Sequence, residues 1–290
     1  MLIINKPRGL TSHDVVMLAR RITGEKRIGH TGTLDPLATG VLVLCIGKAT
    51  RIARYLEADD KEYRAVMKLG IVTDTLDAEG RVLHTKSYEP PSRDMIQQAM
   101  SGFLGQILQT PPAYSAVKIK GTPSYKLARK GESQILTPRL VTIFSIRLDA
   151  YEDPLIRFSL RCSKGVYVRT LCSDIGSTLG MGAHLSELQR TRSGSFSLDR
   201  ALTLEDLSRI ACEGRIRSAL TSMNDALSRF PAVVVSLEDG HRVLHGNRIP
   251  CPARSVIDEK NPVRIQADDG SLLAVARFSE GELRPELVFS

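Results

Sequence analysis

The sequence predicts an α+β fold, with a larger mixed body followed by a small β-rich module. The chain has 290 residues, of which 42% are hydrophobic and 25% are charged. This is an ordinary globular composition, with enough apolar material for one large domain or two. Helix-like and strand-like hydrophobic patterns mix up to residue 231, and strand-like patterns dominate beyond it. We therefore predict a body over residues 1–231 and a module over residues 232–290.

The first part of the body is predicted to contain one helix, one shaped loop and several strands. Apolar runs and alternation predict strands over residues 2–5, 41–46 and 63–69. Thr11 and Ser12 cap a helix that Gly24 ends. Residues 29–40 hold three glycines and one proline, which predicts a loop rather than a regular element.

The rest of the chain continues this mixture and then becomes strand-rich. Helices are predicted over residues 92–103 and 167–179, and strands over residues 141–148 and 155–162. Two prolines open an irregular basic segment at residues 111–131. In the module we expect strands over residues 232–235, 263–266, 272–278 and 287–289, with a hairpin turn at Asp269-Gly270.

The charge of the chain is unevenly distributed. Forty Lys and Arg oppose 32 Asp and Glu, which gives a net charge of +8. From residue 236 onward there are 7 basic and 9 acidic residues, so residues 1–235 carry 33 and 23. A basic body favours a polyanionic partner, although a basic cytosolic protein without such a partner is the alternative.

Cysteine usage and hydropathy favour a cytoplasmic protein without a membrane span. The five cysteines form no C-x-x-C pair, which argues against a disulfide scaffold or a cysteine zinc site. The longest apolar run has six residues, whereas a membrane helix needs about 20. No targeting segment is visible at the N-terminus.

Asp35 is the first candidate for chemistry. It is the only carboxylate between Glu25 and Glu57, and this window also holds several cationic side chains, namely Lys26, Arg27, His30, Lys48, Arg51 and Arg54. Positive neighbours favour the ionised carboxylate, so we expect Asp35 to have a low pKa. Pro36 restricts the backbone before it, which helps to orient the side chain. Asp-Pro is also a common turn dipeptide, which is the structural alternative.

Several standard chemistries lack their motifs in this chain. It contains no phosphate-binding G-x-x-x-x-G-K-[ST], no G-x-S-x-G and no H-x-E with P-C-x-x-C. A glycosidase would need a second carboxylate, and only the fold can show whether one lies nearby. His241 and His245 are four residues apart but lack supporting ligands at the usual spacing. These absences favour chemistry by one ionised aspartate, without a metal or redox cofactor.

Two further segments are candidates for RNA contact. Residues 111–131 carry five basic residues, two tyrosines and no acid, and such a mixture suits phosphates and unstacked bases. A solvated hairpin loop is the alternative. Residues 163–170 follow a strand and open a helix whose backbone N–H groups are able to receive an anion. Arg169 in this segment is able to pair with a carboxylate and orient it, although the segment by itself favours an ordinary helix start with an exposed arginine.

In combination, these segments resemble the TruB family of pseudouridine synthases. Residues 29–40 look like the family signature, and the other family motifs are matched in family order by residues 5–9, 60–63, 69–77 and 163–169. The resemblance covers residues 2–232. Residues 245–249 resemble the start of the PUA-like module of bacterial members.

The resemblance implies both a fold and an activity. The fold is a catalytic core on a mixed, mainly antiparallel sheet flanked by helices, with a thumb-like loop at about residues 111–131 and a PUA-like RNA-binding module over residues 232–290. The activity is isomerisation of uridine 55 in the tRNA T-loop to pseudouridine, without metal or cofactor. The thumb-like segment favours a stand-alone monomer with no obligatory protein partner over a guide-RNA-dependent enzyme.

The resemblance also assigns residues. Asp35 is the implied catalytic carboxylate, acting either by attack on C1′ or by removal of a sugar proton on a glycal route. Tyr63 stacks on the target base and assists loss of its C5 proton, and Arg169 pairs with Asp35. The implied uracil-pocket and RNA-binding residues are His30, Tyr167, Leu188, Lys6, Lys118, Lys120, Tyr125, Lys126, Arg129 and Lys164.

Two other classes of function stay open at this point. A non-catalytic RNA-binding protein or RNA chaperone would use the basic surface but has no need of the set Asp35, Tyr63 and Arg169. A nucleoside hydrolase or glycosylase would release uracil, whereas an isomerase leaves the RNA mass unchanged.

Overall fold

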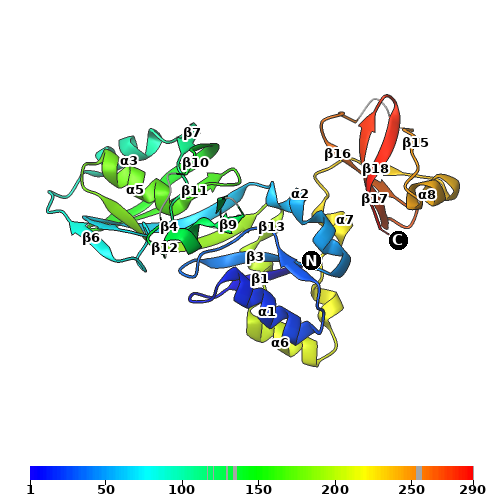
Figure 1. Cartoon of the computed structure of the whole chain (residues 1–290), viewed down its shortest axis with the longest axis horizontal. Helices are drawn as coiled ribbons and strands as arrows, with labels where there is room; N and C mark the ends of the chain where they lie inside the picture. Colours follow the sequence, from blue (N-terminus) through cyan, green and yellow to red (C-terminus); the bar gives the residue numbers. More distant parts are fainter. Residues whose placement is uncertain (116, 120, 129, 133–135, 253–256, 290) are drawn as a thin grey trace.

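A computed structural model describes residues 1–115, 117–119, 121–128, 130–132, 136–252 and 257–289. Its largest element is a nine-stranded sheet in the body (Figure 1). Seven strands follow the order β1 (Leu2–Lys6), β3 (Thr39–Ile46), β12 (Ala183–Ser193), β4 (Lys61–Leu69), β11 (Leu155–Cys162), β10 (Arg139–Glu152) and β7 (Gly105–Gln109). The other two, β2 (Ile28–His30) and β13 (Phe196–Ser197), pair with β3 and β12.

The sheet is mixed and mainly antiparallel, as predicted. Only β3 and β12 pair in parallel, through Thr39 with Gln189 and Gly40 with Arg190. At Gly40 an added Cβ would collide with the backbone carbonyl of Arg190, and φ is +99°. Only glycine accepts both this close approach and this backbone angle, so Gly40 allows the two strands to join.

Four helices cover one face of this sheet. They are α1 (Ser12–Thr23), α3 (Arg93–Ser101), α5 (Val168–Thr178) and α6 (Leu204–Cys212), and their apolar faces share one buried cluster with the strands. Helix α1 shows why the local sequence folds this way. Thr11 and Asp14 form a reciprocal capping box, which contributes about 1 kcal/mol, and Gly24 ends the helix with φ +72°.

Strand β4 confirms the alternation predicted around Tyr63. Tyr63, Ala65, Met67 and Leu69 are buried toward the helices, whereas Arg64 is exposed. Strand β12, by contrast, was not predicted. Its register against β4 shifts twice, between Leu185 and Glu187 and again between Arg190 and Arg192, so its apolar positions lose the period of two that identifies a strand.

Shorter elements complete the body. Two small hairpins are β5 (Ile71–Thr73) with β6 (Val82–Thr85), and β8 (Lys118–Ile119) with β9 (Thr122–Pro123), and the latter leads into α4 (Ser124–Ala128). The segment at residues 111–131, predicted as irregular, therefore holds a hairpin and one helical turn. On the other side of the sheet lie η1 (Gly47–Ile52), α2 (Ala53–Glu57), η2 (Leu198–Arg200) and α7 (Met223–Ala226), whereas η3 (Ile216–Ala219) packs beside α6 on the helix-covered side.

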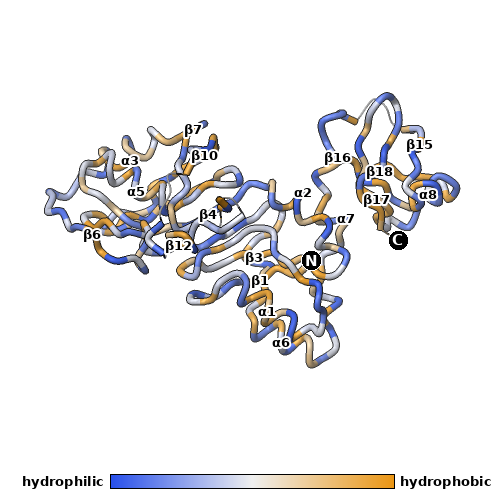
Figure 2. The backbone as a smooth tube through the Cα atoms, viewed as in Figure 1, coloured by the Kyte–Doolittle hydropathy of each residue, from blue (hydrophilic) through white to orange (hydrophobic). Residues whose placement is uncertain are grey.

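The C-terminal module forms its own five-stranded sheet. Its order is β14 (Ala232–Val234), β16 (Pro262–Gln266), β17 (Leu272–Ser279), β18 (Glu282–Val288) and β15 (Ile249–Pro250). Figure 2 shows β17 as largely hydrophobic, and its alanines and Val275 are fully buried. Helix α8 (Leu237–Leu244) was not predicted; it carries His241 and is followed by His245, which the sequence had placed in a strand-rich context.

The module packs against the body through an apolar cluster. Val41 and Val43 on the outer face of β3 share this cluster with Leu272, Val275 and Phe289 of the module. Within the described residues, no helix combines the length and the apolar character needed to cross a membrane. Tyr63 and Leu188, two of the candidate site residues, lie in the cluster on the opposite, helix-covered face of the sheet.

Candidate active site

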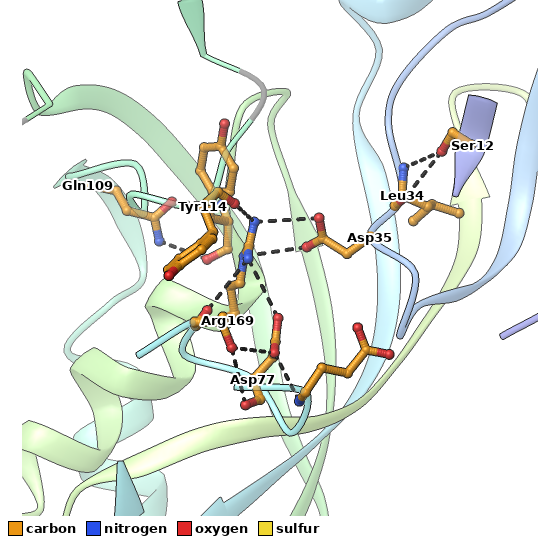
Figure 3. A network of polar contacts seen from close by, with 10 residues as sticks. Ser12, Leu34, Asp35, Asp77, Gln109, Tyr114 and Arg169 are labelled. Atoms are coloured by element: carbon orange, nitrogen blue, oxygen red, sulfur yellow. Dashed lines mark hydrogen bonds and ion pairs between the residues drawn. The ribbon is translucent and has the colours of Figure 1, made fainter. Parts of the chain in front are cut away.

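Asp35 lies on the loop between β2 and β3, and helix α1 fixes the backbone beside it. The Ser12 hydroxyl, at the start of α1, accepts a hydrogen bond from the Leu34 N–H (2.8 Å) and donates one to the Leu34 carbonyl (3.1 Å) (Figure 3). Ser12 is buried. Both backbone polar groups of the residue before Asp35 are thus held by one side chain.

Lys6 holds the residue that follows Asp35. Its ammonium donates hydrogen bonds to the carbonyls of Pro7 (2.9 Å), Leu10 (2.6 Å) and Pro36 (3.3 Å). The residue is 0% exposed, and burial lowers the pKa of Lys6 to about 8 against the raising effect of Asp35. We expected Lys6 to bind RNA, but its burial and its three carbonyl partners instead make it a clamp on the Asp35 loop.

Arg169 connects Asp35 to two other segments of the chain. The guanidinium approaches both carboxylate oxygens of Asp35, with Nε and Nη2 each 3.4 Å away (Figure 3). Nη2 also donates to the Tyr114 carbonyl (2.6 Å), and Nη1 lies 3.5 Å from the Asp77 carboxylate. The Arg169 side chain is 5% exposed and that of Asp35 is 35% exposed. Arg169 therefore contacts the buried side of the Asp35 carboxylate, and the other side stays accessible to solvent.

Asp77 is the acidic partner that sequence reasoning did not select. Its carboxylate accepts hydrogen bonds from the Thr75 hydroxyl (2.6 Å) and the Glu79 N–H (3.1 Å), and its side chain is 7% exposed. It lies on the same guanidinium as Asp35, although 42 positions separate them in the chain. The second carboxylate that the sequence left open is thus present, on the far side of Arg169.

The pKa of Asp35 is raised, not lowered as we expected from the sequence. Burial is the main cause and the Asp77 charge adds to it, whereas Arg169 and Lys6 lower the pKa. The sequence argument was wrong because it counted cations close in the chain. The cations that influence the carboxylate come from Lys6 and Arg169 instead, and their charge does not outweigh desolvation.

Tyr63 and Leu188 lie on adjacent strands, β4 and β12, and each is 9% exposed. Burial raises the pKa of Tyr63, the Arg190 charge lowers it, and the Asp35 charge raises it. The phenol therefore lies within electrostatic reach of both Asp35 and Arg190. Of the three residues to which catalysis was assigned, Arg169 contacts Asp35, and Tyr63 is linked to Asp35 through the charge effect on its pKa.

Arg190 is a second residue that sequence reasoning missed. It is 3% exposed, and its guanidinium donates to the Val41 carbonyl (2.7 Å) and the Gly32 carbonyl (3.1 Å). These contacts hold the loop of Asp35 from the β12 side. No local pattern identifies such a residue, because an arginine in a strand is usually exposed.

Tyr167 lies beside Arg169, whose guanidinium is 6.0 Å from the centroid of its ring, and His30 is the last residue of β2. Gln109 accepts a hydrogen bond from the Tyr167 N–H (2.8 Å) and donates one to its carbonyl (3.1 Å), so the N–H before α5 is already used. The Nδ1 atom of His30 accepts from the Gly32 N–H (3.3 Å). Burial lowers the pKa of His30, and Arg190 lowers it further, so the imidazole is neutral at pH 7.

The remaining predicted RNA contacts lie at the surface. Lys118, Lys126 and Lys164 are exposed, and Tyr125 is half-buried. Lys120 and Arg129 lie outside the described residues. Among the described residues, no group of three or more His, Cys, Asp and Glu side chains is arranged to hold a metal ion.

Comparison with known proteins identifies the family. A model described as the N-terminal domain of TruB family pseudouridylate synthase matches residues 20–168. A second model, the tRNA pseudouridylate synthase B C-terminal domain, matches residues 169–228. These matches cover Asp35, Tyr63 and Arg169, and the chain belongs to the TruB family of pseudouridylate synthases.

Curated relatives and solved structures extend this comparison over the whole chain. The tRNA pseudouridine synthase B of Geotalea uraniireducens is 42% identical over 95% of this chain and 90% of the relative, and that of Burkholderia lata is 44% identical over 99% and 88%. A structure of an H/ACA RNP bound to a substrate RNA aligns with TM-score 0.78 and 27% identity, covering 100% of this chain and 84% of that one. A Cbf5-Nop10-Gar1 complex gives TM-score 0.78 and 29% identity over the same shares.

Proposed function

We propose that this protein converts uridine 55 in the T-loop of tRNA to pseudouridine, without metal or cofactor. The observation that carries the proposal is Asp35, which keeps an open edge while Arg169 holds it from behind. The names of the curated relatives support tRNA as the substrate, and the matches to them span nearly the whole chain.

The reaction is an isomerisation, so its atoms balance within the RNA. The N1–C1′ bond breaks, a C5–C1′ bond forms, C5 loses a proton and N1 gains one. Ionised Asp35 attacks C1′ or removes a sugar proton to open a glycal route. In either case Arg169 orients the carboxylate and stabilises its charged form.

Tyr63, Leu188, Tyr167 and His30 are proposed to receive the flipped-out uridine. Extruding a base costs a few kcal/mol, and stacking on aromatic side chains offsets part of that cost. Tyr63 also accepts the C5 proton in this proposal. A closed apolar pocket excludes water, which would otherwise hydrolyse the detached sugar.

The basic segment at residues 111–131 and Lys164 are proposed to contact the phosphates of the T-stem-loop. Lys118, Lys126 and Lys164 are exposed and therefore able to reach a polyanion. We further propose that residues 232–290 form a PUA-like RNA-binding module after the boundary at residue 231. The enzyme acts in the cytoplasm as a stand-alone monomer in this proposal, unlike the protein assemblies named for the 27–29% identical structures.

Tritium release from tRNA labelled at C5 of its uridines tests this proposal. We expect release with an intact T-loop and none when the T-loop uridine is replaced. Absence of release from both substrates would favour a non-catalytic RNA-binding protein. Mass analysis of the same RNA separates the remaining alternative, because a glycosylase would remove the mass of uracil.

A further inference from the structure

Arg190 is a buried cation without a buried anionic partner. Among the residues that the structure describes, no carboxylate oxygen lies within 4.0 Å of its guanidinium. Arg169, which is similarly buried, has two such partners in Asp35 and Asp77. The two arginines therefore differ in what balances their charge.

Burying a charge that has no anionic partner costs free energy, so packing alone does not explain why an arginine occupies this position. The carbonyls of Val41 and Gly32 recover part of the lost hydration through hydrogen bonds of 2.7 and 3.1 Å. Neutral donors would satisfy two carbonyls at lower cost. Tyr63 is the residue that lies opposite Arg190 on the neighbouring strand.

The strand register places Arg190 against Tyr63. The two residues are direct partners in the antiparallel pair of β12 and β4, and such partners have Cβ atoms about 5 Å apart. The Arg190 charge lowers the pKa of the Tyr63 phenol. Both side chains are at least nine-tenths buried, so little solvent screens the interaction.

We propose that Arg190 is a positioning residue whose positive charge, placed opposite Tyr63 by the strand register, stabilises the phenolate form of Tyr63 while Tyr63 takes the C5 proton. This inference rests on the proposed function, in which Tyr63 accepts that proton. Asp35 and Cys162 act on the phenol in the opposite direction, since both raise the pKa of Tyr63. Arg190 is the group that counters them.

The step balances within the proposed reaction. Once C5 is bonded to C1′, the phenolate oxygen of Tyr63 takes the C5 proton. The electrons of the C5–H bond restore the C5–C6 double bond, and the π electrons of the C6–N1 bond return to N1. N1 gains a proton from solvent, which balances the hydroxyl proton that Tyr63 gives up when its phenolate forms. No oxidant, reductant or cofactor takes part.

The test compares Arg190→Gln and Arg190→Lys in single-turnover reactions at saturating tRNA. Substrates carry hydrogen or deuterium at C5 of the T-loop uridine. We expect Arg190→Gln to be about 100-fold slower, at the low end of what assisted proton transfer contributes, and to show a larger deuterium isotope effect than the wild type. Arg190→Lys keeps the charge on a different geometry and should recover part of both the rate and the wild-type isotope effect.

Arg192→Gln is the matched control. It lies two residues further along β12, pairs with Glu62 and has a side chain that is 47% exposed. It should leave the rate and the isotope effect unchanged. If Arg190→Gln does not fold, a folded Arg190→Lys carries the test, and a wild-type isotope effect in that variant overturns the inference.

Tyr63→Phe separates failure of the inference from failure of the proposed function. If Tyr63→Phe is slow and adding Arg190→Gln slows it little further, the two residues act together and the inference stands. If the two losses multiply and Arg190→Gln keeps the wild-type isotope effect, Arg190 is merely structural. Full activity of Tyr63→Phe would instead remove the proposed role of Tyr63, and the inference with it.

Discussion

The Asp35 loop and the segment at residues 111–131 are both exceptions to the regular sheet, but they are held in opposite ways. Buried side chains from three separate elements bind the backbone of the loop, namely Lys6, Ser12 and Arg190. The described part of the basic segment is held chiefly by its own short hairpin and turn. Its lysines extend outward.

This contrast separates two tasks. A catalytic carboxylate must meet the reacting atom in one geometry, which favours a loop fixed from several sides. Phosphate contacts act over longer distances and tolerate varied positions, which suits exposed lysines on a locally held segment. Changes to the loop should therefore affect rate, and changes to the segment should affect binding.

Asp35→Asn should have the largest effect. It removes the anion that attacks C1′ or accepts the sugar proton, so we expect a loss of about 10⁴-fold or more in turnover. Tritium release and tRNA binding should be measured on the same preparation, and binding should be retained. Substantial turnover by a sequence-verified variant would contradict the assigned role.

Arg169→Gln and Asp77→Asn should both slow turnover, by about 10²- to 10³-fold, because each breaks the support of Asp35. Their pH profiles should shift in opposite directions. Arg169 lowers the pKa of Asp35 and Asp77 raises it. The acid limb of kcat/KM should therefore move to higher pH in Arg169→Gln and to lower pH in Asp77→Asn; a common direction would contradict this arrangement.

Lys6→Met should reduce stability by about 2 kcal/mol, because it leaves buried carbonyls without a donor. The pKa of Lys6 is about 8 in the folded protein and about 10.4 in an unfolded chain. Between these pH values the unfolded chain binds more protons, so the free energy of unfolding rises with pH. Denaturant titrations at pH 7.5 and 10 should show about one proton less of this dependence in Lys6→Met, and an unchanged slope would argue against it.

The double change Lys118→Glu with Lys126→Glu should have the smallest effect on chemistry. We expect KM for tRNA to rise about 10-fold with kcat nearly unchanged, and binding to become less dependent on salt. Lys26→Glu, an exposed change outside the segment, serves as control. Equal weakening by the control would show that only net charge matters.

Local signals in the sequence predicted much of the fold. The cap at Thr11, the stop at Gly24 and the alternation beginning at Tyr63 each depend on neighbours a few positions away. The pairing of Asp35 with Arg169 was expected only through the family resemblance. Interactions between sequence neighbours explain the helix and the strand, but they do not determine which distant side chains come into contact.

The missed features share a long-range cause. Two register shifts interrupt the alternating pattern of strand β12, and Gly40 lets β3 lie directly against the backbone of Arg190. The role of Asp77 could be recognised only from the structure, in which Arg169 contacts both Asp77 and Asp35. Lys6 was misjudged because a lysine is ordinarily exposed, and nothing near it in the chain shows three carbonyls converging on it.

The hydrogen bond from Arg169 to the Tyr114 carbonyl has a mechanical consequence. Tyr114 stands at the base of the basic segment, and the same guanidinium grips the carboxylate of Asp35. The position of Arg169 against Asp35 therefore depends in part on the backbone of this segment at Tyr114. A substitution that moves this carbonyl should also alter how Arg169 orients the Asp35 carboxylate.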